Sequence, residues 1–382
     1  MSTAAPLRVA MLGHKRIPGR EGGVEIVVRE LAVRMARLGH HVDVYNRWDL
    51  FTEGGKMGDP VYQGVRIYQV PTPHASSLNA FVYSVLAMLR CSFKRYDVVH
   101  VHAIGTSAML WLPHLLGKKT VVTVHGLDWQ RAKWGKFASF YLRVGEKMAM
   151  RYADEVIVLS RGNQQYFEDT YGRRTLLIPN GMEPQQPPEP DVITAKHGLG
   201  RGDYVLYLGR LVPEKGVHYL IDAFAGIETG KRLVIAGPLD FSNPYCQRLQ
   251  DMAAKDKRVL LTGFVQGREL EELYGNCSVY VLPSDVEGMP LSLLEAISYG
   301  ARCLTSDIDE NVQAAKGCAR VFHHGDVISL REELEALLAD PKLTTVEPGA
   351  SWESWDEVTR RTLEVYHAVL GAGAPMEGRS LT

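Results

Sequence analysis

The stretch Val279-Tyr-Val-Leu-Pro-Ser-Asp-Val-Glu-Gly-Met-Pro-Leu-Ser-Leu-Leu-Glu295 joins an apolar, β-rich run to a helical pattern. The run ends in Pro and Ser, a Gly-Met-Pro turn follows, and Leu291, Leu294 and Glu295 recur at helical spacing. This succession of strand, loop and helix predicts a parallel α/β sheet, in which ligands bind at the carboxyl ends of the strands. We therefore expect the carboxylates of Glu287 and Glu295 to face one cleft, where they can hold several hydroxyl groups of a sugar nucleotide.

Two cations follow another apolar strand upstream of this stretch. The run 204–209 leads into Arg210 and Lys215. Arginine binds phosphate through a planar fork, and lysine adds a mobile point charge. Near the N-terminus, Gly22 and Gly23 follow the strand 8–13 and open a predicted helix. Paired glycines at a helix start let backbone amides approach a diphosphate, and the helix dipole favours the anion.

Together these residues resemble the retaining glycosyltransferases of the GT-B fold, family four, over nearly the whole chain. The resemblance rests on the Glu-x7-Glu pair at 287 and 295 and the Arg-x4-Lys pair at 210 and 215. The stretches 15–25 and 125–134 resemble, more narrowly, bacterial rhamnosyltransferase-like enzymes that build surface polysaccharides. The implied fold is α/β, with two Rossmann-like, doubly wound parallel-sheet domains that face a cleft.

The resemblance also implies roles for individual residues. Arg210, Lys215 and the Gly23 amide would stabilise the departing diphosphate. Glu287 would hold the donor sugar, and Glu295 would accept hydrogen bonds from the ribose. His125 matches the family position beside the reacting sugar, where its backbone carbonyl is thought to help. The implied catalytic residues are Glu287, His125, Arg210 and Lys215, and the implied donor site comprises Gly22, Gly23, Arg210, Lys215, Phe264, Val265, Glu287, Gly288, Met289, Leu291 and Glu295.

One departure from the expected loop chemistry lies between the two glutamates. Pro290 has no amide hydrogen, so the backbone donors of this loop would come from Gly288, Met289 and Leu291. The base edge would meet the backbone around Phe264 and Val265.

The histidines give no indication of a metal cofactor. His100 and His102 share one face of a strand, and His125 ends the next strand. No carboxylate or thiol with ligand spacing accompanies them, and enzymes of the resembling family typically need no metal. We expect no cofactor besides the nucleoside-diphosphate sugar, which is a co-substrate.

Alternation of strand-like and helical segments predicts two domains. Expected strands include 8–13, 41–46, 65–70, 97–103, 119–126 and 155–160, and the pattern resumes at 204 with further strands at 232–237, 259–264, 279–284 and 302–307. The proline-rich run 184–190 interrupts it. We expect an N-terminal acceptor-binding domain over 1–183, a C-terminal nucleotide-sugar-binding domain over 184–350, a helix over 351–370 that by resemblance crosses back to the N-terminal domain, and a tail over 371–382.

Composition excludes several classes of protein. The 382 residues are 46% hydrophobic and 23% charged, which suits a large globular enzyme rather than a disordered chain. The N-terminus lacks the apolar core of a signal peptide, and no run of roughly 20 apolar residues could span a bilayer. We expect a cytoplasmic chain. Its five scattered cysteines indicate reduced thiols rather than a disulfide framework or a zinc site.

Charge is divided unevenly along the chain. Residues 1–183 hold 24 Lys and Arg against 15 Asp and Glu, whereas the remainder holds 19 against 29. A predicted amphipathic helix over 129–152 carries an apolar stripe and a basic stripe. The basic stripe, with Lys133, Lys136, Arg143 and Lys147, could rest on anionic lipid or guide a lipid-linked acceptor toward the cleft.

Other interpretations of these patterns remain open. Glu287 and Glu295 could be a solvated helix start, Arg210 and Lys215 a surface turn paired with Glu214, and the basic helix a core helix with solvated charges. Two other functions also fit the fold, namely a sugar-nucleotide epimerase and a non-catalytic sugar-nucleotide-binding protein. No Gly-x-Gly-x-x-Gly follows the first strand, which argues against a dinucleotide oxidoreductase. No nucleic-acid partner is expected.

Overall fold

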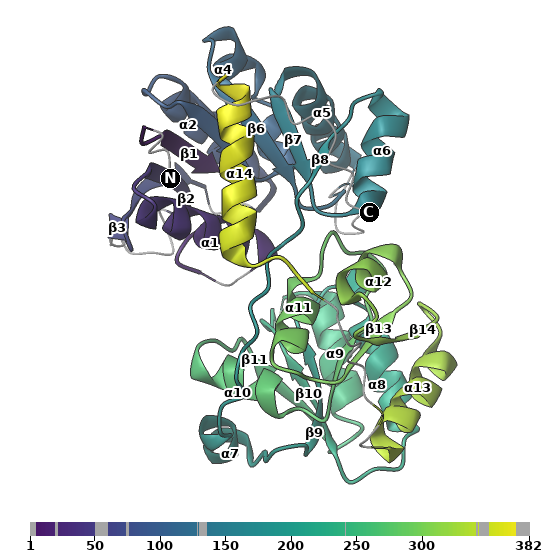
Figure 1. Ribbon diagram of the computed structural model, residues 1–382. Helices are drawn as coiled ribbons and strands as arrows, with labels where there is room; N and C mark the ends of the chain where they lie inside the picture. The colour runs from purple at the N-terminus through teal and green to yellow at the C-terminus, as the bar shows by residue number, and fades with distance from the viewer. Residues whose placement is uncertain are drawn as a thin grey trace. The chain divides into compact units, whose positions relative to one another are not determined.

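The computed structural model divides the chain into two compact units, each built on one parallel or mostly parallel sheet (Figure 1). The first unit comprises Met1–Gly181 and Glu353–Thr382, and the second comprises Met182–Trp352. The structure describes residues 5–19, 22–49, 60–73, 76–127, 129, 136–240, 242–340, 343 and 351–371, without the side chains of residues 49, 76–78 and 136–138.

The sheet of the first unit has the strand order β3-β4-β2-β1-β5-β6-β7-β8. Neighbouring strands are parallel, except that β3 pairs antiparallel with β4. Residues Val9 to Leu12 of β1 are all fully buried, so helices cover both faces of the sheet. The strands are β1 Arg8–Leu12, β2 His41–Asp49, β3 Val61–Tyr62, β4 Val65–Thr72, β5 Val98–Val101, β6 Lys119–Val124, β7 Glu155–Val158 and β8 Leu176–Leu177.

The helices of the first unit include one from the end of the chain. They are α1 Gly23–Arg37, α2 Ser76–Ser92, α3 Ile104–Ser107, α4 Trp111–Leu115, α5 Lys136–Tyr152, α6 Arg161–Tyr171 and α14 Trp355–Val369. Helix α14 begins at Ser354, whose side chain accepts a hydrogen bond from the Glu357 amide at 3.1 Å. Its Tyr366 hydroxyl is hydrogen-bonded to His100 Nδ1 on β5 at 2.7 Å. The last helix is therefore part of the core of the first unit.

The sheet of the second unit is parallel throughout, in the order β11-β10-β9-β12-β13-β14. Its strands are β9 Tyr204–Leu208, β10 Arg232–Ala236, β11 Val259–Gly263, β12 Val279–Leu282, β13 Cys303–Ser306 and β14 Arg320–Phe322. The accompanying helices are α7 Asp191–His197, the 3₁₀ turn η2 Pro213–Lys215, α8 Val217–Ala225, α9 Pro244–Ala253, α10 Arg268–Asn276, α11 Leu291–Ser298, α12 Asp309–Ala315 and α13 Val327–Ala339. The expected class, two doubly wound α/β units, is confirmed.

Three short strands and one helix start differ from the sequence-based prediction. The strands β3, β8 and β14 contain only two or three residues each, too few for an alternating pattern to be recognised. The helix predicted over 129–152 begins at Lys136, and Trp129 lies outside it. Within the described residues, no helix is both long enough and apolar enough to cross a membrane. All five cysteines are free, as expected.

Candidate functional site

The predicted site residues of the second unit gather where its strand order reverses. Strand β9 lies between β10 and β12, and the later strands β12 to β14 extend away from β10 and β11. Such a switch point is where open α/β sheets bind ligands, at the carboxyl ends of the strands. The loop after β9 carries Arg210 and Lys215, and the loop after β12 carries Glu287.

An ion pair joins these two loops. Lys215 Nζ lies 2.5 Å from Glu287 Oε1, and only 15% and 7% of the two side chains are exposed. The loops approach this closely because Gly216 has no side chain. A Cβ at Gly216 would lie 1.9 Å from the Pro283 carbonyl oxygen, and its φ of +66° also favours glycine. The predicted cation and the predicted carboxylate are thus brought together.

The Ser284 hydroxyl is a second donor to the Glu287 carboxylate. The Ser284 hydroxyl, which is fully buried, donates to Glu287 Oε1 at 2.7 Å. Ser306 Oγ donates to the Ser284 carbonyl at 2.5 Å, and Asn311 Nδ2 donates to Ser306 Oγ at 2.9 Å. Strand β13 and helix α12 thereby hold the β12 loop in place. The sequence analysis identified Ser284 only as the end of a strand. A polar residue directly after an apolar run was the signal that could have identified it as a site residue.

Glu295 has a different partner, on helix α10. The Tyr274 hydroxyl donates to Glu295 Oε2 at 3.1 Å. The Tyr274 ring stacks on Tyr299, with ring centroids 5.9 Å apart and planes 9° apart. The aromatic stack orients the hydroxyl that holds the Glu295 carboxylate. Sequence analysis missed Tyr274, because nothing in the local pattern links residues 21 positions apart.

Arg210 differs from Lys215 in having no charged partner among the residues that the structure describes. The Tyr207 hydroxyl donates to the Arg210 carbonyl at 2.9 Å and fixes the backbone at the end of β9. Among the described residues, no carboxylate forms an ion pair with the Arg210 guanidinium, which leaves its fork for a ligand. Glu214, the alternative partner for Lys215 in a surface turn, is buried, and its carboxylate oxygens accept no hydrogen bond from the part of the chain that the structure describes.

The remaining predicted donor-site residues of the second unit flank these loops. Phe264 follows β11 and is 47% exposed, whereas Val265 is buried. Gly288 is buried in the loop before α11, Met289 follows it half-buried, and Leu291 is the first residue of that helix. Pro290 is the N-cap of α11. The backbone amides at the start of a helix have no partner within the helix, so the missing amide of Pro290 costs no helical hydrogen bond.

The first unit has its own switch point between β1 and β5, and histidines occupy it. His14 follows β1, His102 follows β5, and His125 follows β6. His102 Nδ1 lies 3.2 Å from His125 Nε2, and the rings of His100 and His102 have centroids 4.0 Å apart. On the described residues, His14 Nδ1 and His102 Nε2 are buried without a hydrogen-bond partner.

Burial keeps His14, His100 and His102 uncharged. Desolvation lowers the pKa of His14 to about 4, although its hydrogen bond to Asn46 acts in the opposite direction. Desolvation lowers the pKa of His100 to about 3 and that of His102 well below its usual value. The side chains therefore act as neutral hydrogen-bonding groups near pH 7. The described residues contain no group of three or more His, Cys, Asp or Glu that could hold a metal ion.

The predicted phosphate-binding glycines begin helix α1. Gly22 is the N-cap with extended backbone, and Gly23 is the first helical residue. Glu25, in the first turn, is buried and accepts a hydrogen bond from the Lys15 amide at 2.8 Å. Glu25 thus ties the loop after β1 to the start of α1, a role that sequence analysis did not assign.

Helix α5 buries a different face from the predicted one. The predicted stripe included Tyr141, Val144 and Met148, which are half-buried, and the buried residues are Leu142, Gly145, Glu146, Ala149 and Met150. Glu146 is buried because three donors satisfy it: Trp129 Nε1 at 2.8 Å, Tyr166 Oη at 2.8 Å and Tyr171 Oη at 2.6 Å.

The basic side of α5 faces outward where it is described. Arg143 and Lys147 are exposed, and the Arg143 guanidinium lies 4.8 Å from the centre of the Trp129 ring. Lys133 and the Lys136 side chain lie outside the described residues. The prediction of an exposed basic stripe is therefore confirmed for its second half only.

Two families of known proteins match this chain in succession. Residues 21–186 match Glycosyltransferase Family 4, and residues 191–346 match Glycosyl transferases group 1. The UDP-Gal:alpha-D-GlcNAc-diphosphoundecaprenol alpha-1,3-galactosyltransferase of Escherichia coli is 29% identical over 276 residues, which cover 68% of this chain and 70% of that protein. An uncharacterized glycosyltransferase of Methanocaldococcus jannaschii is 27% identical over 335 residues, covering 79% and 81%.

Solved structures share the fold at lower identity. Sucrose-phosphate synthase from Thermosynechococcus elongatus has a TM-score of 0.79 at 20% identity, over 97% of this chain and 100% of that chain. The glycosyltransferase WaaG has a TM-score of 0.70 at 20% identity, over 95% and 98%. These likenesses confirm the expected GT-B fold.

Proposed function

Because the chain is a family-4-like, group 1 glycosyltransferase with the GT-B fold, we propose that it transfers a sugar from a nucleoside-diphosphate donor to a saccharide or lipid-linked saccharide acceptor, with retention of configuration. The observation that carries this proposal is the arrangement of Arg210, Lys215 and Glu287 at the switch point of the second unit. Two cations beside a fixed carboxylate suit a ligand that joins a diphosphate to a polyhydroxylated ring.

The cations would act on the leaving group. Negative charge grows on the diphosphate as the glycosidic bond to the sugar breaks, and preorganised positive groups stabilise that charge. Arg210 would supply a planar fork, and Lys215 a point charge held at a fixed place by Glu287. Since these two side chains can carry the electrostatic work, we propose that the reaction needs no metal ion. The amides at Gly22 and Gly23 are proposed as a further phosphate-binding element of the first unit.

The carboxylates would orient the donor. Glu287 would accept hydrogen bonds from the sugar hydroxyls, with its position fixed by Ser284 and Lys215. Glu295, held by Tyr274, would accept from the ribose hydroxyls. The backbone at Phe264 and Val265 would meet the base.

No enzyme nucleophile is required in this proposal. The departing phosphate would take the proton from the acceptor hydroxyl as the new glycosidic bond forms on the same face of the sugar. The side chain of His125 is already engaged with His102, which suits a contribution through its backbone carbonyl rather than through proton transfer.

We further propose a role in cell-surface polysaccharide biosynthesis, with rhamnose as the first donor sugar to test. The Escherichia coli relative, whose name gives a diphosphoundecaprenol-linked acceptor, supports an acceptor on a lipid carrier. The enzyme would then work in the cytoplasm at the inner face of the membrane. The basic face of α5, which carries Arg143 and Lys147, would add electrostatic attraction to anionic lipid.

A donor panel tests the reaction. Thermal shift and nucleoside-diphosphate release are measured with dTDP-rhamnose, UDP-hexoses and GDP-mannose, with and without acceptor. A donor at 100 times its dissociation constant should stabilise the chain by about 2.7 kcal/mol. Acceptor-dependent release supports the transferase. Conversion of the donor to an epimer without acceptor would indicate the epimerase instead, and binding without turnover of any donor and acceptor would indicate a binding protein.

A further inference from the structure

Helix α2 exposes apolar side chains from Phe81 onward. Phe81, Leu86 and Leu89 are 43%, 39% and 39% exposed, and Phe93, just past the end of the helix, is 74% exposed. The opposite face is fully buried in the core through Tyr83, Ala87 and Met88. A helix that is apolar on both its buried and its outer side needs a second apolar environment, because water alone does not favour the outer side chains.

The neighbouring helix α4 continues this apolar surface. Trp111, Leu115 and Leu116 are 40%, 72% and 45% exposed. Helices α2 and α4 contact each other, and the loops that follow them are joined where Lys118 Nζ donates to the Lys94 carbonyl at 2.6 Å. We call the exposed side chains of Phe81, Leu86, Leu89, Phe93, Trp111, Leu115 and Leu116 the α2–α4 surface.

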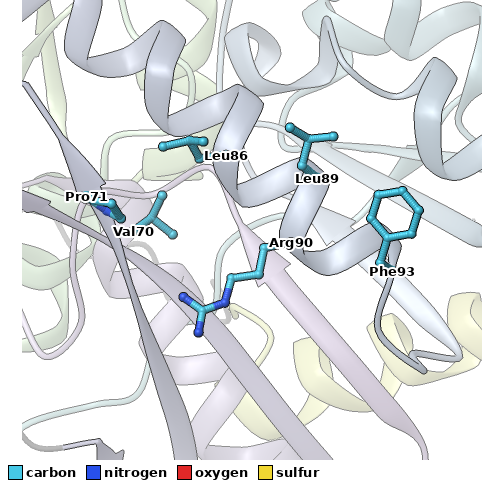
Figure 2. A pocket seen from close by; sticks show the side chains of 6 residues that line it. All are labelled: Val70, Pro71, Leu86, Leu89, Arg90 and Phe93. Atoms are coloured by element: carbon cyan, nitrogen blue, oxygen red, sulfur yellow. The ribbon is translucent and has the colours of Figure 1, made fainter.

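A shallow groove lies at one edge of this surface, between α2 and β4. Figure 2 shows Val70 and Pro71 of β4 opposite Leu86, with Leu89 and Phe93 farther along the helix. Its volume is about 400 Å³, and Arg90 is the one charged side chain among its described lining residues. A groove with apolar walls and a cation at its border matches an acyl chain that carries an anionic headgroup.

The chain segment that carries the α2–α4 surface is mostly cationic. Residues 61–127 contain six Lys and Arg but a single acidic residue, Asp97. The Asp97 carboxylate accepts a hydrogen bond from the Arg8 backbone amide at 2.7 Å. In the part of the chain that the structure describes, Arg90, Lys94, Arg95 and Lys118 form no ion pair with a carboxylate. The apolar residues therefore have a cationic border.

We propose that the α2–α4 surface inserts into the headgroup region of an anionic phospholipid bilayer, with α2 lying in the plane of the interface. Leu and Phe side chains favour the acyl boundary, Trp favours the headgroup level, and Arg and Lys reach lipid phosphates. An unpaired cationic border favours lipid over a second copy of this chain, because the same border on the copy would repel it. The proposal needs no part of the proposed reaction, and lipid binding can be measured without turnover.

Vesicle co-sedimentation tests this assignment with the full chain. The triple variant Leu89→Ser, Phe93→Ser and Leu115→Ser removes three exposed apolar side chains, so it should fold normally. Its partition onto phosphatidylglycerol vesicles should fall by roughly 10²-fold at every salt concentration, since apolar insertion is not screened. The matched control, Val312→Ser, Val321→Ser and Ile328→Ser, removes exposed apolar side chains from the second unit and should bind like the wild type.

Salt separates this surface from the basic face of α5. Replacing Lys133, Lys136, Arg143 and Lys147 by Gln should weaken binding at low salt only, because the attraction of these charges is screened. The α2–α4 proposal is overturned if the triple variant binds vesicles like the wild type, or if the wild type stays in the supernatant. Equal binding to pure phosphatidylcholine overturns the anionic part. A wild-type dimer that the triple variant converts to monomer, without lipid, assigns the surface to a second copy instead.

Discussion

Replacing Lys215 by Met tests whether the ion pair with Glu287 is a structural requirement as well as a functional one. Methionine keeps the length of the side chain but removes the charge, so Glu287, with a side chain only 7% exposed, would lose its cation. Breaking a buried pair costs 3–5 kcal/mol, and we expect about 3 kcal/mol, because 15% of Lys215 is exposed and Ser284 still donates to the carboxylate. At about 2–4 °C per kcal/mol, the melting temperature should fall by roughly 6–12 °C.

The assay is a double-mutant cycle on unfolding free energy, with Lys215→Met, Glu287→Gln and the double variant. Because removing both charges leaves no unpaired ion, the double variant should regain all but about 1 kcal/mol of the stability, yet its turnover should remain low. Lys196→Met is the control. Its pair with Glu269 has a similar distance, 2.6 Å, but Lys196 is 57% exposed, so the loss should stay under about 1 kcal/mol. If the losses of the two single variants simply add in the double variant, the two charges are not coupled and the reasoning is wrong.

Three further predictions concern the two switch points. Arg210→Ala should lower turnover by roughly 10²-fold or more, since it removes a preorganised donor, whereas the exposed Arg201→Ala should not; normal turnover in a folded Arg210 variant contradicts the assignment. Glu295→Gln should weaken binding of free nucleoside diphosphate more than Glu287→Gln does, because that ligand has a ribose but no sugar, and titration calorimetry showing the reverse order would exchange their roles. Burial holds the pKa of His14 at about 4 and that of His100 at about 3, whereas both histidines titrate near 6.5 in the unfolded state, which therefore binds more protons below that pH. The free energy of unfolding should fall by about 2 kcal/mol between pH 6 and pH 5 because of these two groups. Denaturant titrations of His100→Gln should show half of this pH dependence.

The strands and the charged site residues were accessible from sequence because their signals are local. Apolar runs such as 204–208 and 279–282 are continuous, and the residues that follow them lie at the carboxyl edge of the sheet in any parallel arrangement. The contact between Lys215 and Glu287 was not predicted, because it depends on how closely two loops that are distant in sequence approach each other.

The partners that hold the site residues were not accessible, because they join distant elements. Ser306 reaches Ser284 from the next strand, and Tyr274 reaches Glu295 from another helix. Periodicity also misjudged α5, where a buried glutamate satisfied by Trp and Tyr donors occupies a position that hydropathy would turn outward. Helix α5 buries a polar residue, whereas α2 exposes apolar ones. A helix with apolar residues on all sides is expected to be buried, yet one side of α2 is exposed.

The place of α14 in the first unit has a consequence for biosynthesis. The helix supplies Tyr366, whose hydroxyl is hydrogen-bonded to His100, and Arg361, which donates to the Leu177 carbonyl at 2.6 Å, but it is synthesised after the whole second unit. At 5–20 residues per second, translation of Met182–Trp352 takes on the order of ten to thirty seconds. During this time the first unit lacks α14, and His100 lacks its hydrogen bond to the Tyr366 hydroxyl. The second unit can finish folding before the first, so the order of completion along this chain is the reverse of the order of synthesis. Expressing residues 1–181 alone would give a first unit that permanently lacks α14. A first unit with a complete core requires residues 353–371 to be joined to it.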